Sequence, residues 1–216
     1  MKWKYCFSGG VLLSGLWIAI FFIRPADTSR LAVTNESSAT GNVAVVWAQP
    51  VEMRFNLYRM GPDLYRSALP DKTAGSLLTQ LGVTTVVNFY QRGDESWLSD
   101  PHIRQVHIPF HADRVRDEDV IRILLSIREA EREGGVLIHC KHGQSRTGLI
   151  AAMYRLVYQG WSKAQVLDEM RNGGFGGGER LSDAEEYIRQ VDVAGIRSAI
   201  EGNRCSTSRF ALCYLK

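Results

Sequence analysis

The stretch Val136-Leu-Ile-His-Cys-Lys-His-Gly-Gln-Ser-Arg-Thr-Gly148 decides both the fold and the chemistry. A short apolar run, typical of a buried strand, ends at Cys140, and a helix is expected to begin near Arg146. Between a strand and a helix, backbone N–H groups can turn inward, and the helix N-terminus adds the positive end of its dipole. Residues 140–146, called the cysteine loop below, therefore predict a cradle for a phosphate group.

The side chains of the cysteine loop fit nucleophilic attack on phosphorus. Positive surroundings favour ionisation of a cysteine, so we expect Cys140 to be a thiolate nucleophile. Arg146 can hold two phosphate oxygens with its planar guanidinium group, and Gly143 permits a turn that a side chain would obstruct. The predicted phosphate-binding residues are Lys141, His142, Gly143, Gln144, Ser145 and Arg146. We expect His139 to orient the loop or hold the thiolate, and Thr147 to donate a hydrogen bond to the sulfur.

Two simpler interpretations of this stretch are weaker. One is that Cys140 is an inert buried cysteine at the end of a strand. The other is that His139, Cys140 and His142 are metal ligands. Their spacing is too tight for an ordinary zinc site, and the sequence offers no second ligand pair. We therefore expect neither a metal nor another cofactor.

Residues 139–147 resemble the signature loop of cysteine-dependent tyrosine and dual-specificity phosphatases. More closely, the chain resembles the bacterial periplasmic dual-specificity tyrosine phosphatases associated with biofilm control. The similarity extends over residues 50–216, with supporting segments at 56–60, 64–70, 111–115, 148–161 and 209–213. The resemblance implies a compact phosphatase domain with a shallow cleft, which hydrolyses phosphoric monoesters without a metal.

The reaction needs a carboxylic acid, because phenolate and alkoxide are poor leaving groups that must be protonated. Asp113, Asp117 and Asp119 lie between the strand expected near Val106 and the next helix. Asp117 and Asp119 fit acids at a helix start, where the helix dipole stabilises them. Asp113 precedes the helix and is free to face a cleft, and the resemblance at residues 111–115 also selects it. Asp94, on another loop, is a distant alternative.

The flanking sequence alternates strands and helices. Strands are expected at residues 84–89, 106–108 and 136–139, and a hairpin at 55–58 and 64–66 around Gly61-Pro62-Asp63. Helices are expected after Asp71, from Asp117 and from residues 146 to 159, and two more at the capping boxes Ser162/Gln165 and Ser182/Glu185. The fold class is therefore α/β, a single domain with a central, mostly parallel sheet flanked by helices. We expect the glycine run at residues 173–178 to be a flexible connection between helices, with a mobile wall near the cleft as the weaker alternative.

The amino terminus has the pattern of an export signal. Lys2 and Lys4 precede an apolar run at residues 7–23, so residues 1–23 are expected to be a signal peptide or a membrane anchor. The charge bias places everything after the run outside the cytoplasm. Residues 24–49 are expected to be a flexible tether, and residues 50–216 the phosphatase domain. We predict a periplasmic protein, either cleaved or anchored to the inner membrane by residues 7–23.

Charge and cysteine content limit the partners. The 216 residues carry 26 Lys and Arg against 23 Asp and Glu, and a net charge of +3 is too small for a nucleic-acid footprint. Of the four cysteines, Cys6 belongs to the export segment and Cys140 must stay a free thiolate. Cys205 and Cys213 are left as the expected disulfide in an oxidising compartment.

The function predicted from these patterns is an exported protein phosphatase acting on phosphotyrosine, and also on phosphoserine or phosphothreonine. Its expected partner is a phosphorylated protein, such as the extracytoplasmic domain of an inner-membrane protein, and the chain is expected to be a monomer. The alternatives are a phosphoinositide or inositol polyphosphate phosphatase, and a non-catalytic module that binds phosphoproteins. The presence of Cys140, Arg146 and Asp113 together favours an enzyme.

Overall fold

The computed structural model describes residues 45–208 of the chain. The expected export segment and nearly all of the expected tether lie outside the described residues. Cys205 is disulfide-bonded, and Cys213, its expected partner, also lies outside the described residues. Within residues 45–208, each helix is too short or too polar to cross a lipid bilayer.

Six strands form one sheet in the order β1-β2-β3-β6-β4-β5. The strands are β1 Gln49–Glu52, β2 Leu57–Arg59, β3 Leu64–Ser67, β4 Val83–Asn88, β5 Arg104–His107 and β6 Gly135–His139. Strands β3, β6, β4 and β5 are parallel, whereas β1 and β2 pair antiparallel at one edge. The predicted hairpin between β2 and β3 and the mostly parallel central sheet are confirmed.

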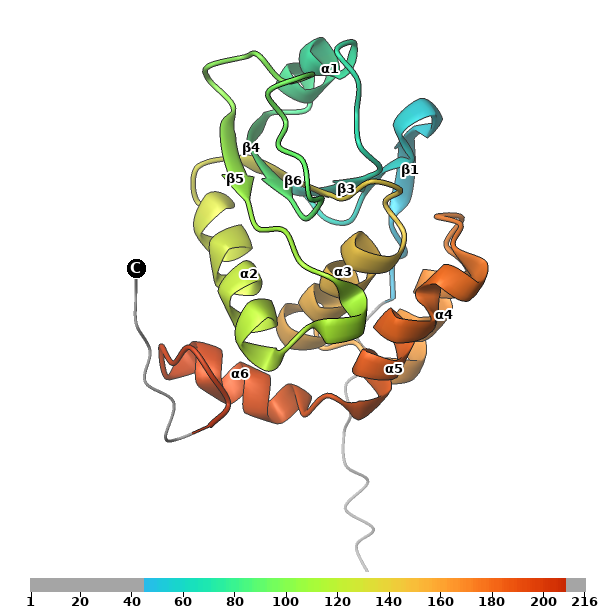
Figure 1. Cartoon of the computed structure of the whole chain (residues 1–216), viewed down its shortest axis with the longest axis vertical. Coiled ribbons are helices and arrows are strands. Elements are labelled where there is room, and N and C mark those ends of the chain that lie inside the picture. Colours follow the sequence, from blue (N-terminus) through green and yellow to red (C-terminus); the bar gives the residue numbers. More distant parts are fainter. Residues whose placement is uncertain (1–44, 209–216) are drawn as a thin grey trace, which may run out of the picture. The chain divides into compact units, whose positions relative to one another are not determined.

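Helices cover both faces of the sheet unequally. They are α1 Ala74–Gln80, α2 Asp117–Ala130, α3 Ser145–Tyr158, α4 Lys163–Asn172, α5 Ser182–Gln190 and α6 Val193–Glu201, with short 3-10 turns η1 Met53–Phe55, η2 Ala112–Arg114 and η3 Gly178–Leu181. In Figure 1, α1 lies on one side of the sheet, and α2 and α3 lie on the other. The smaller apolar cluster includes residues of α1, and the larger one fills the face covered by α2 and α3.

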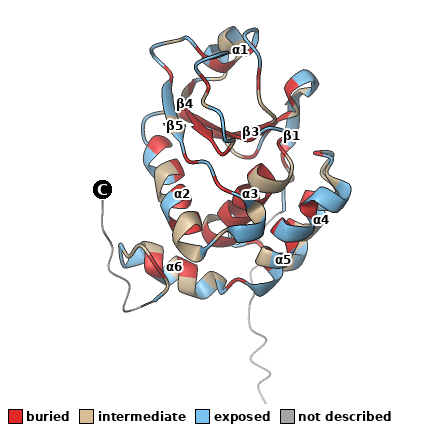
Figure 2. Cartoon of the chain, in the orientation of Figure 1, coloured by how far each residue is buried: buried red, intermediate tan, exposed pale blue. Residues whose placement is uncertain are grey.

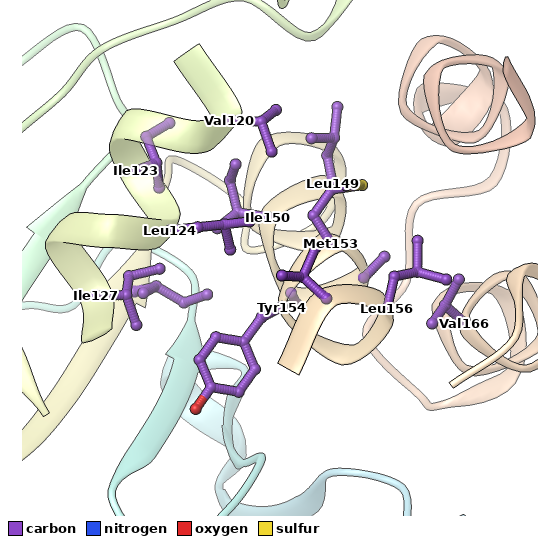
Figure 3. Packing of buried hydrophobic residues seen from close by; sticks show 14 of the residues in the cluster. Val120, Ile123, Leu124, Ile127, Leu149, Ile150, Met153, Tyr154, Leu156 and Val166 are labelled. Carbon is purple, nitrogen blue, oxygen red and sulfur yellow. The ribbon is translucent and has the colours of Figure 1, made fainter. Parts of the chain in front are cut away.

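Helix α3 is the centre of the larger cluster. Its residues from Thr147 to Val157 are all buried, and Figure 2 shows this burial along the helix. Figure 3 shows side chains of α2 facing Ile150 and Met153 of α3, while Leu156 faces Val166 of α4. Burying one such side chain contributes about 1.5–3 kcal/mol. The helix that follows the cysteine loop is therefore held from several sides.

Of the two predicted capping boxes, one is present in the structure and the other is not. Ser162 and Gln165 form the predicted box, because each side chain accepts the other residue's backbone N–H. The box predicted for Ser182 and Glu185 is wrong. Ser182 is already the first residue of α5, which continues from η3, and its side chain caps nothing. The Glu185 carboxylate instead forms an ion pair with Arg171 of α4.

A buried ion pair joins the start of the domain to α3 and α4. Arg155 donates two hydrogen bonds to the Glu169 carboxylate, at 3.0 and 2.7 Å. The backbone N–H of Ala48 donates to the same carboxylate at 2.7 Å, and Ala48 is buried. Since β1 begins at Gln49, the packed chain starts slightly before the expected boundary at residue 50.

Candidate active site

The cysteine loop lies at the carboxyl end of the central strand β6. This strand pairs with β3 on one side and β4 on the other, so that Ser67 and Asn88 both align with His139. Cys140 follows immediately and begins the turn into α3. In open α/β sheets, ligands bind in the crevice outside the carboxyl ends of the strands. The sequence-predicted cradle therefore occupies the expected ligand site of the fold.

Carbonyl groups of the cysteine loop are held from outside. The backbone N–H of Leu69 donates to the Lys141 carbonyl at 3.3 Å. The Asn56 side-chain amide donates to the His142 carbonyl at 3.3 Å. A peptide whose carbonyl is held outward presents the N–H of the same peptide unit to the inside of the loop. These contacts therefore turn the loop's donors toward the space that a phosphate would fill.

Gly143 is required by both conformation and space. Its φ of +70° lies in the left-handed region that favours glycine. A Cβ added there would lie 2.6 Å from the Ala68 nitrogen and 2.7 Å from the Ser67 carbonyl oxygen, which are backbone atoms of the segment beside it. Its own carbonyl accepts a hydrogen bond from Arg66 Nη2 at 2.8 Å. The close approach of two backbones thus fixes the middle of the loop.

The inward N–H groups are available for a ligand. Within residues 45–208, no protein acceptor is found for the backbone N–H groups of Lys141, Gly143, Gln144 and Ser145. Ser145 begins α3, whose first N–H groups have no intrahelical partner. The loop thus combines free donors with a helix N-terminus, an arrangement that binds phosphate.

The Cys140 thiol is buried, with 2% of its surface exposed. Burial alone would raise its pKa, yet the pKa lies below the usual value. The opposing causes are the Thr147 hydroxyl, the backbone N–H groups of Thr147 and His142, and the positive charge of Arg146. The interior of the cradle therefore favours the thiolate, the form that attacks phosphorus.

Thr147 is placed to stabilise the charged sulfur. Its hydroxyl is buried and makes no hydrogen bond of standard geometry within the described part of the chain. The Thr147 hydroxyl lies near the Cys140 sulfur without the distance and angle of a standard hydrogen bond. It nevertheless lowers the pKa of Cys140 and so favours the thiolate. A charged acceptor makes shorter and stronger hydrogen bonds than a neutral one. The contact is therefore expected to tighten when the thiol ionises.

Arg146 is oriented by the end of β4. Its Nη1 donates to the Phe89 carbonyl at 3.0 Å, and its guanidinium carbon lies 5.5 Å from the centre of the Tyr90 ring. A guanidinium group carries five N–H donors in a planar fork. Donation to Phe89 uses one of them and leaves the others for phosphate oxygens.

His139 and Asp94 form a buried pair behind Cys140. His139 is fully buried, and its Nδ1 lies 3.3 Å from the Cys140 carbonyl oxygen while its Nε2 lies 3.2 Å from the Asp94 carboxylate. Asp94 also accepts hydrogen bonds from Asn88 Nδ2 at 2.9 Å and Trp97 Nε1 at 2.8 Å. The distant alternative Asp94 is therefore committed to the support of His139 and is not placed as an acid.

The other two acid candidates also have structural contacts. Asp117 accepts hydrogen bonds from the Tyr187 hydroxyl at 2.8 Å and from Thr207 Oγ1 at 3.2 Å. Asp119 accepts from the backbone N–H of Arg116 and so closes the first turn of α2. Both carboxylates therefore hold the start of α2 in place.

Asp113 remains the candidate for the general acid, because within the described residues its carboxylate is not held by a structural contact. It lies in η2, which packs against α3, the helix that the cysteine loop opens. Its side chain is 55% exposed, and its ion pair with Arg114 is a surface contact of 3.6 Å. Such exposed pairs contribute little energy, so the carboxyl group can exchange this partner for a substrate oxygen.

The glycine run is packed against Asn56, Tyr58 and Arg66, so it is not the free connection that was expected and forms part of the packed structure beside the cysteine loop. Phe175 in the middle of the run is buried, and its carbonyl accepts a hydrogen bond from the Asn56 amide at 2.9 Å. The Tyr58 hydroxyl donates to the Gly174 carbonyl at 3.0 Å. The Arg66 guanidinium carbon lies 3.6 Å from the centre of the Phe175 ring.

Asn56, Arg66 and Phe175 are the supporting residues that sequence reasoning missed. One signal could have found Arg66: it is an arginine within a buried strand that lies beside the strand of the nucleophile.

Lys141 and His142 are exposed at the mouth of the loop. Within residues 45–208, His, Cys, Asp and Glu side chains do not gather in any group of three that could hold a metal ion.

Comparisons with known proteins agree with this geometry. A family model described as the DSP-PTPase phosphatase domain of the Swiss Army Knife type, PTP-SAK, matches residues 69–191. The chain belongs to this phosphatase family. The dual-specificity protein phosphatase TpbA of Pseudomonas aeruginosa strain UCBPP-PA14 is 52% identical over 170 residues, which are 79% of this chain and 78% of that protein. The family resemblance found in the sequence is confirmed, and the chain is an enzyme of the dual-specificity phosphatase class.

A solved structure of this relative matches the fold. The crystal structure of a cysteine-to-serine variant of P. aeruginosa TpbA in complex with phosphotyrosine is 51% identical, with a TM-score of 0.70 over 72% of this chain and 96% of that chain.

An inositol diphosphatase of Arabidopsis thaliana is a weaker relative in sequence. It is 29% identical over 86 residues, which are 40% of this chain and 32% of that protein.

Replacing Thr147 with valine is expected to raise the pKa of Cys140. The thiolate exists above that pKa, so the pH midpoint for reaction of the cysteine with iodoacetamide should move upward by about one unit, as expected for the loss of one hydrogen bond to a charged group. Alkylation rates measured across a pH series give the midpoint. Thr147→Ser keeps the hydroxyl and should match the wild type, and equal midpoints for valine and wild type would contradict the role of Thr147.

Proposed function

We propose that the chain is an exported protein phosphatase that hydrolyses phosphotyrosine, and also phosphoserine and phosphothreonine, through a phosphocysteine intermediate. The observation that carries the proposal is the cysteine loop itself. Free N–H groups and Arg146 surround a buried cysteine whose pKa is lowered. The phosphotyrosine complex of the relative TpbA supports the substrate class.

In the first step, the Cys140 thiolate attacks phosphorus and forms the S–P bond while the P–O bond to the substrate breaks. Asp113 gives its proton to the departing oxygen, so that tyrosine leaves as a neutral phenol. The inward N–H groups and Arg146 hold the three equatorial oxygens, where negative charge gathers in the transition state. The products of this step are the dephosphorylated protein and phosphocysteine.

In the second step, the Asp113 carboxylate removes a proton from water, which attacks phosphorus and breaks the S–P bond. Inorganic phosphate leaves, and the thiolate and the protonated Asp113 are restored. Thr147 stabilises the sulfur as it departs, because a hydroxyl donor interacts more strongly with a thiolate than with the neutral sulfur of phosphocysteine. The cycle consumes one water molecule for each phosphate.

A second candidate substrate is an inositol polyphosphate. Lys141 and Arg180 are both exposed near the mouth of the loop, and Arg180 Nη1 lies 3.5 Å from the Gln144 side-chain oxygen. Burial and the positive charges of these two residues lower the pKa of His142. A basic mouth suits a substrate with several phosphates, and the Arabidopsis relative is an inositol diphosphatase. An exported enzyme would seldom meet such a substrate, and we therefore favour phosphoproteins.

Substrate class and nucleophile can be tested together. We expect phosphate release from phosphotyrosine peptides to exceed release from phosphoserine and phosphothreonine peptides and from inositol hexakisphosphate. Cys140→Ser should release none from any substrate and should still bind the phosphotyrosine peptide, because the N–H groups and Arg146 remain. Substantial turnover by Cys140→Ser would rule out the covalent mechanism, and a preference for the inositol compound would select the second candidate.

Asp113→Asn is expected to slow hydrolysis of a phosphotyrosine peptide by roughly 100-fold or more, since general acids contribute about that much. The loss should be much smaller for an aryl phosphate with an acidic nitrophenol leaving group, which departs without a proton. Steady-state kcat for both substrates measures the difference. Asp119→Asn serves as the control, because Asp119 closes a helix turn. Equal losses for the two substrates would assign the acid to another residue.

We also propose that the enzyme works in the periplasm and acts as a monomer on a phosphorylated protein, such as an extracytoplasmic domain of an inner-membrane protein. The apolar run at residues 7–23 supports export, and the disulfide-bonded Cys205 suits an oxidising compartment. Residues 1–49 fused to alkaline phosphatase, which needs disulfides, should give an active enzyme in bacteria. An inactive fusion that accumulates in the cytoplasm would contradict export.

A further inference from the structure

Arg66 is a buried arginine on the same face of the sheet as the nucleophile. In the parallel pairing of β3 with β6, Arg66 aligns with Ile138. Aligned residues share a face and alternate residues of a strand return to it, so Arg66, Ile138 and Cys140 face the layer of α3. The arginine is 2% exposed. A cation is therefore buried beneath the cysteine loop.

The guanidinium group of Arg66 contacts the back of the cysteine loop. Its Nη2 donates to the Gly143 carbonyl at 2.8 Å, and a Cβ added to Gly148 in α3 would lie 3.6 Å from the same nitrogen. The Phe175 ring covers the guanidinium group, with its centre 3.6 Å from the guanidinium carbon. Arg66 is thus enclosed by the loop, the first turn of α3 and the glycine run.

In the described part of the chain, Arg66 has no carboxylate partner of its own, unlike the other charged groups buried in the domain. Arg155 is paired with Glu169, and Glu185 is paired with arginines of α4 and α5. Asp94 contacts His139. Within residues 45–208, Arg66 is the buried arginine that lacks a carboxylate within 4 Å. Burying a charge is costly unless an opposite charge compensates it. Two anions act on Arg66: the Glu169 carboxylate, which Arg155 already binds, and Cys140 when it is ionised.

We propose that Arg66 is a positioning residue: from behind the cysteine loop it fixes the Gly143 peptide and supplies the buried positive charge that the Cys140 thiolate balances. The two cations then have different tasks. Arg146 is partly exposed and faces the substrate, whereas Arg66 is sealed from it and acts through the loop. This inference rests on the proposed function, because a balanced thiolate matters only if Cys140 is the nucleophile.

The electrostatics around Arg66 include Cys140 among the negative groups that act on it. Burial lowers its pKa to about 10, while the negative charges of Glu169 and Cys140 act in the opposite direction. Arg66 therefore keeps its charge at neutral pH. The charged or titratable groups that act on Arg66 are Glu169, Cys140, Arg155 and Tyr58. Those around Cys140 are His142 and Arg146, with the His139–Asp94 pair behind the loop.

Two substitutions separate the charge from a purely structural role. Arg66→Gln keeps a hydrogen-bond donor without the charge, and Arg66→Lys keeps the charge without the planar fork. We expect Gln to raise the pH midpoint of iodoacetamide alkylation at Cys140 by about one unit or more and Lys to leave it near the wild-type value. The Lys variant should still lose about tenfold in kcat/KM, because the Gly143 peptide is less well held.

The alkylation is measured on the full chain, with Cys140→Ser as the blank for other cysteines and circular dichroism as the check of folding. Because alkylation needs no turnover, its midpoint tests Arg66 even if the proposed substrate is wrong. Equal midpoints for wild type and both variants would overturn the charge balance. Equal upward shifts for Gln and Lys would reduce Arg66 to a structural role.

A measurement on the wild-type chain covers the case in which neither variant folds. The Nε–H signal of Arg66 in NMR spectra should titrate with the same midpoint as Cys140 alkylation, and this titration should vanish in Cys140→Ser. The Arg155 signal is the internal control, since Glu169 balances that charge. An Arg66 signal that does not follow the thiol, or that titrates equally in Cys140→Ser, would contradict the proposal.

Discussion

The structure depends on lowering the pKa of a thiol in a place that water hardly reaches. Cys140 is 2% exposed, and burial by itself opposes its ionisation. Inside a protein, an anion is tolerated only where donors and positive charge replace the lost water. The cysteine loop supplies both, through the N–H groups turned inward and the start of α3. The rest of the domain can be understood as the means of holding those donors in place.

Rigidity of the loop comes from outside it. Leu69, Asn56 and Arg66 bind successive carbonyls, and each comes from a segment that is far away in the sequence. The loop also joins two of the most buried elements, the central strand β6 and the central helix α3. Phosphate donors on such a loop are preorganised, so no reorganisation is needed when charge develops on the phosphoryl group. Gly143 allows the second backbone to come close enough to complete the arrangement.

Local chemistry was predictable from the sequence, and tertiary support was not. The strand, the turn and the helix around Cys140 leave a pattern within 13 residues, from which the cradle, Arg146 and the α/β class could be predicted. Asn56 contacts the loop, and Phe175 contacts Asn56 and Arg66, only because of the final packing. Nothing in their own neighbourhoods in the sequence indicates it. The failed capping box has the same cause. Ser182 and Glu185 have the right spacing, but Arg171 of another helix takes the carboxylate.

Asp94 and Asp113 show why a general acid cannot be built like the nucleophile. Asp94 is buried and accepts hydrogen bonds from Asn88 and Trp97 while it contacts His139, so its oxygens are already occupied. A carboxylate buried in this way can hold His139 in place, but it cannot give a proton to a substrate and later take one from water. Asp113 lies on a short 3-10 turn with more than half of its side chain exposed. It therefore keeps the exposure to water that the proposed proton transfer in both steps requires.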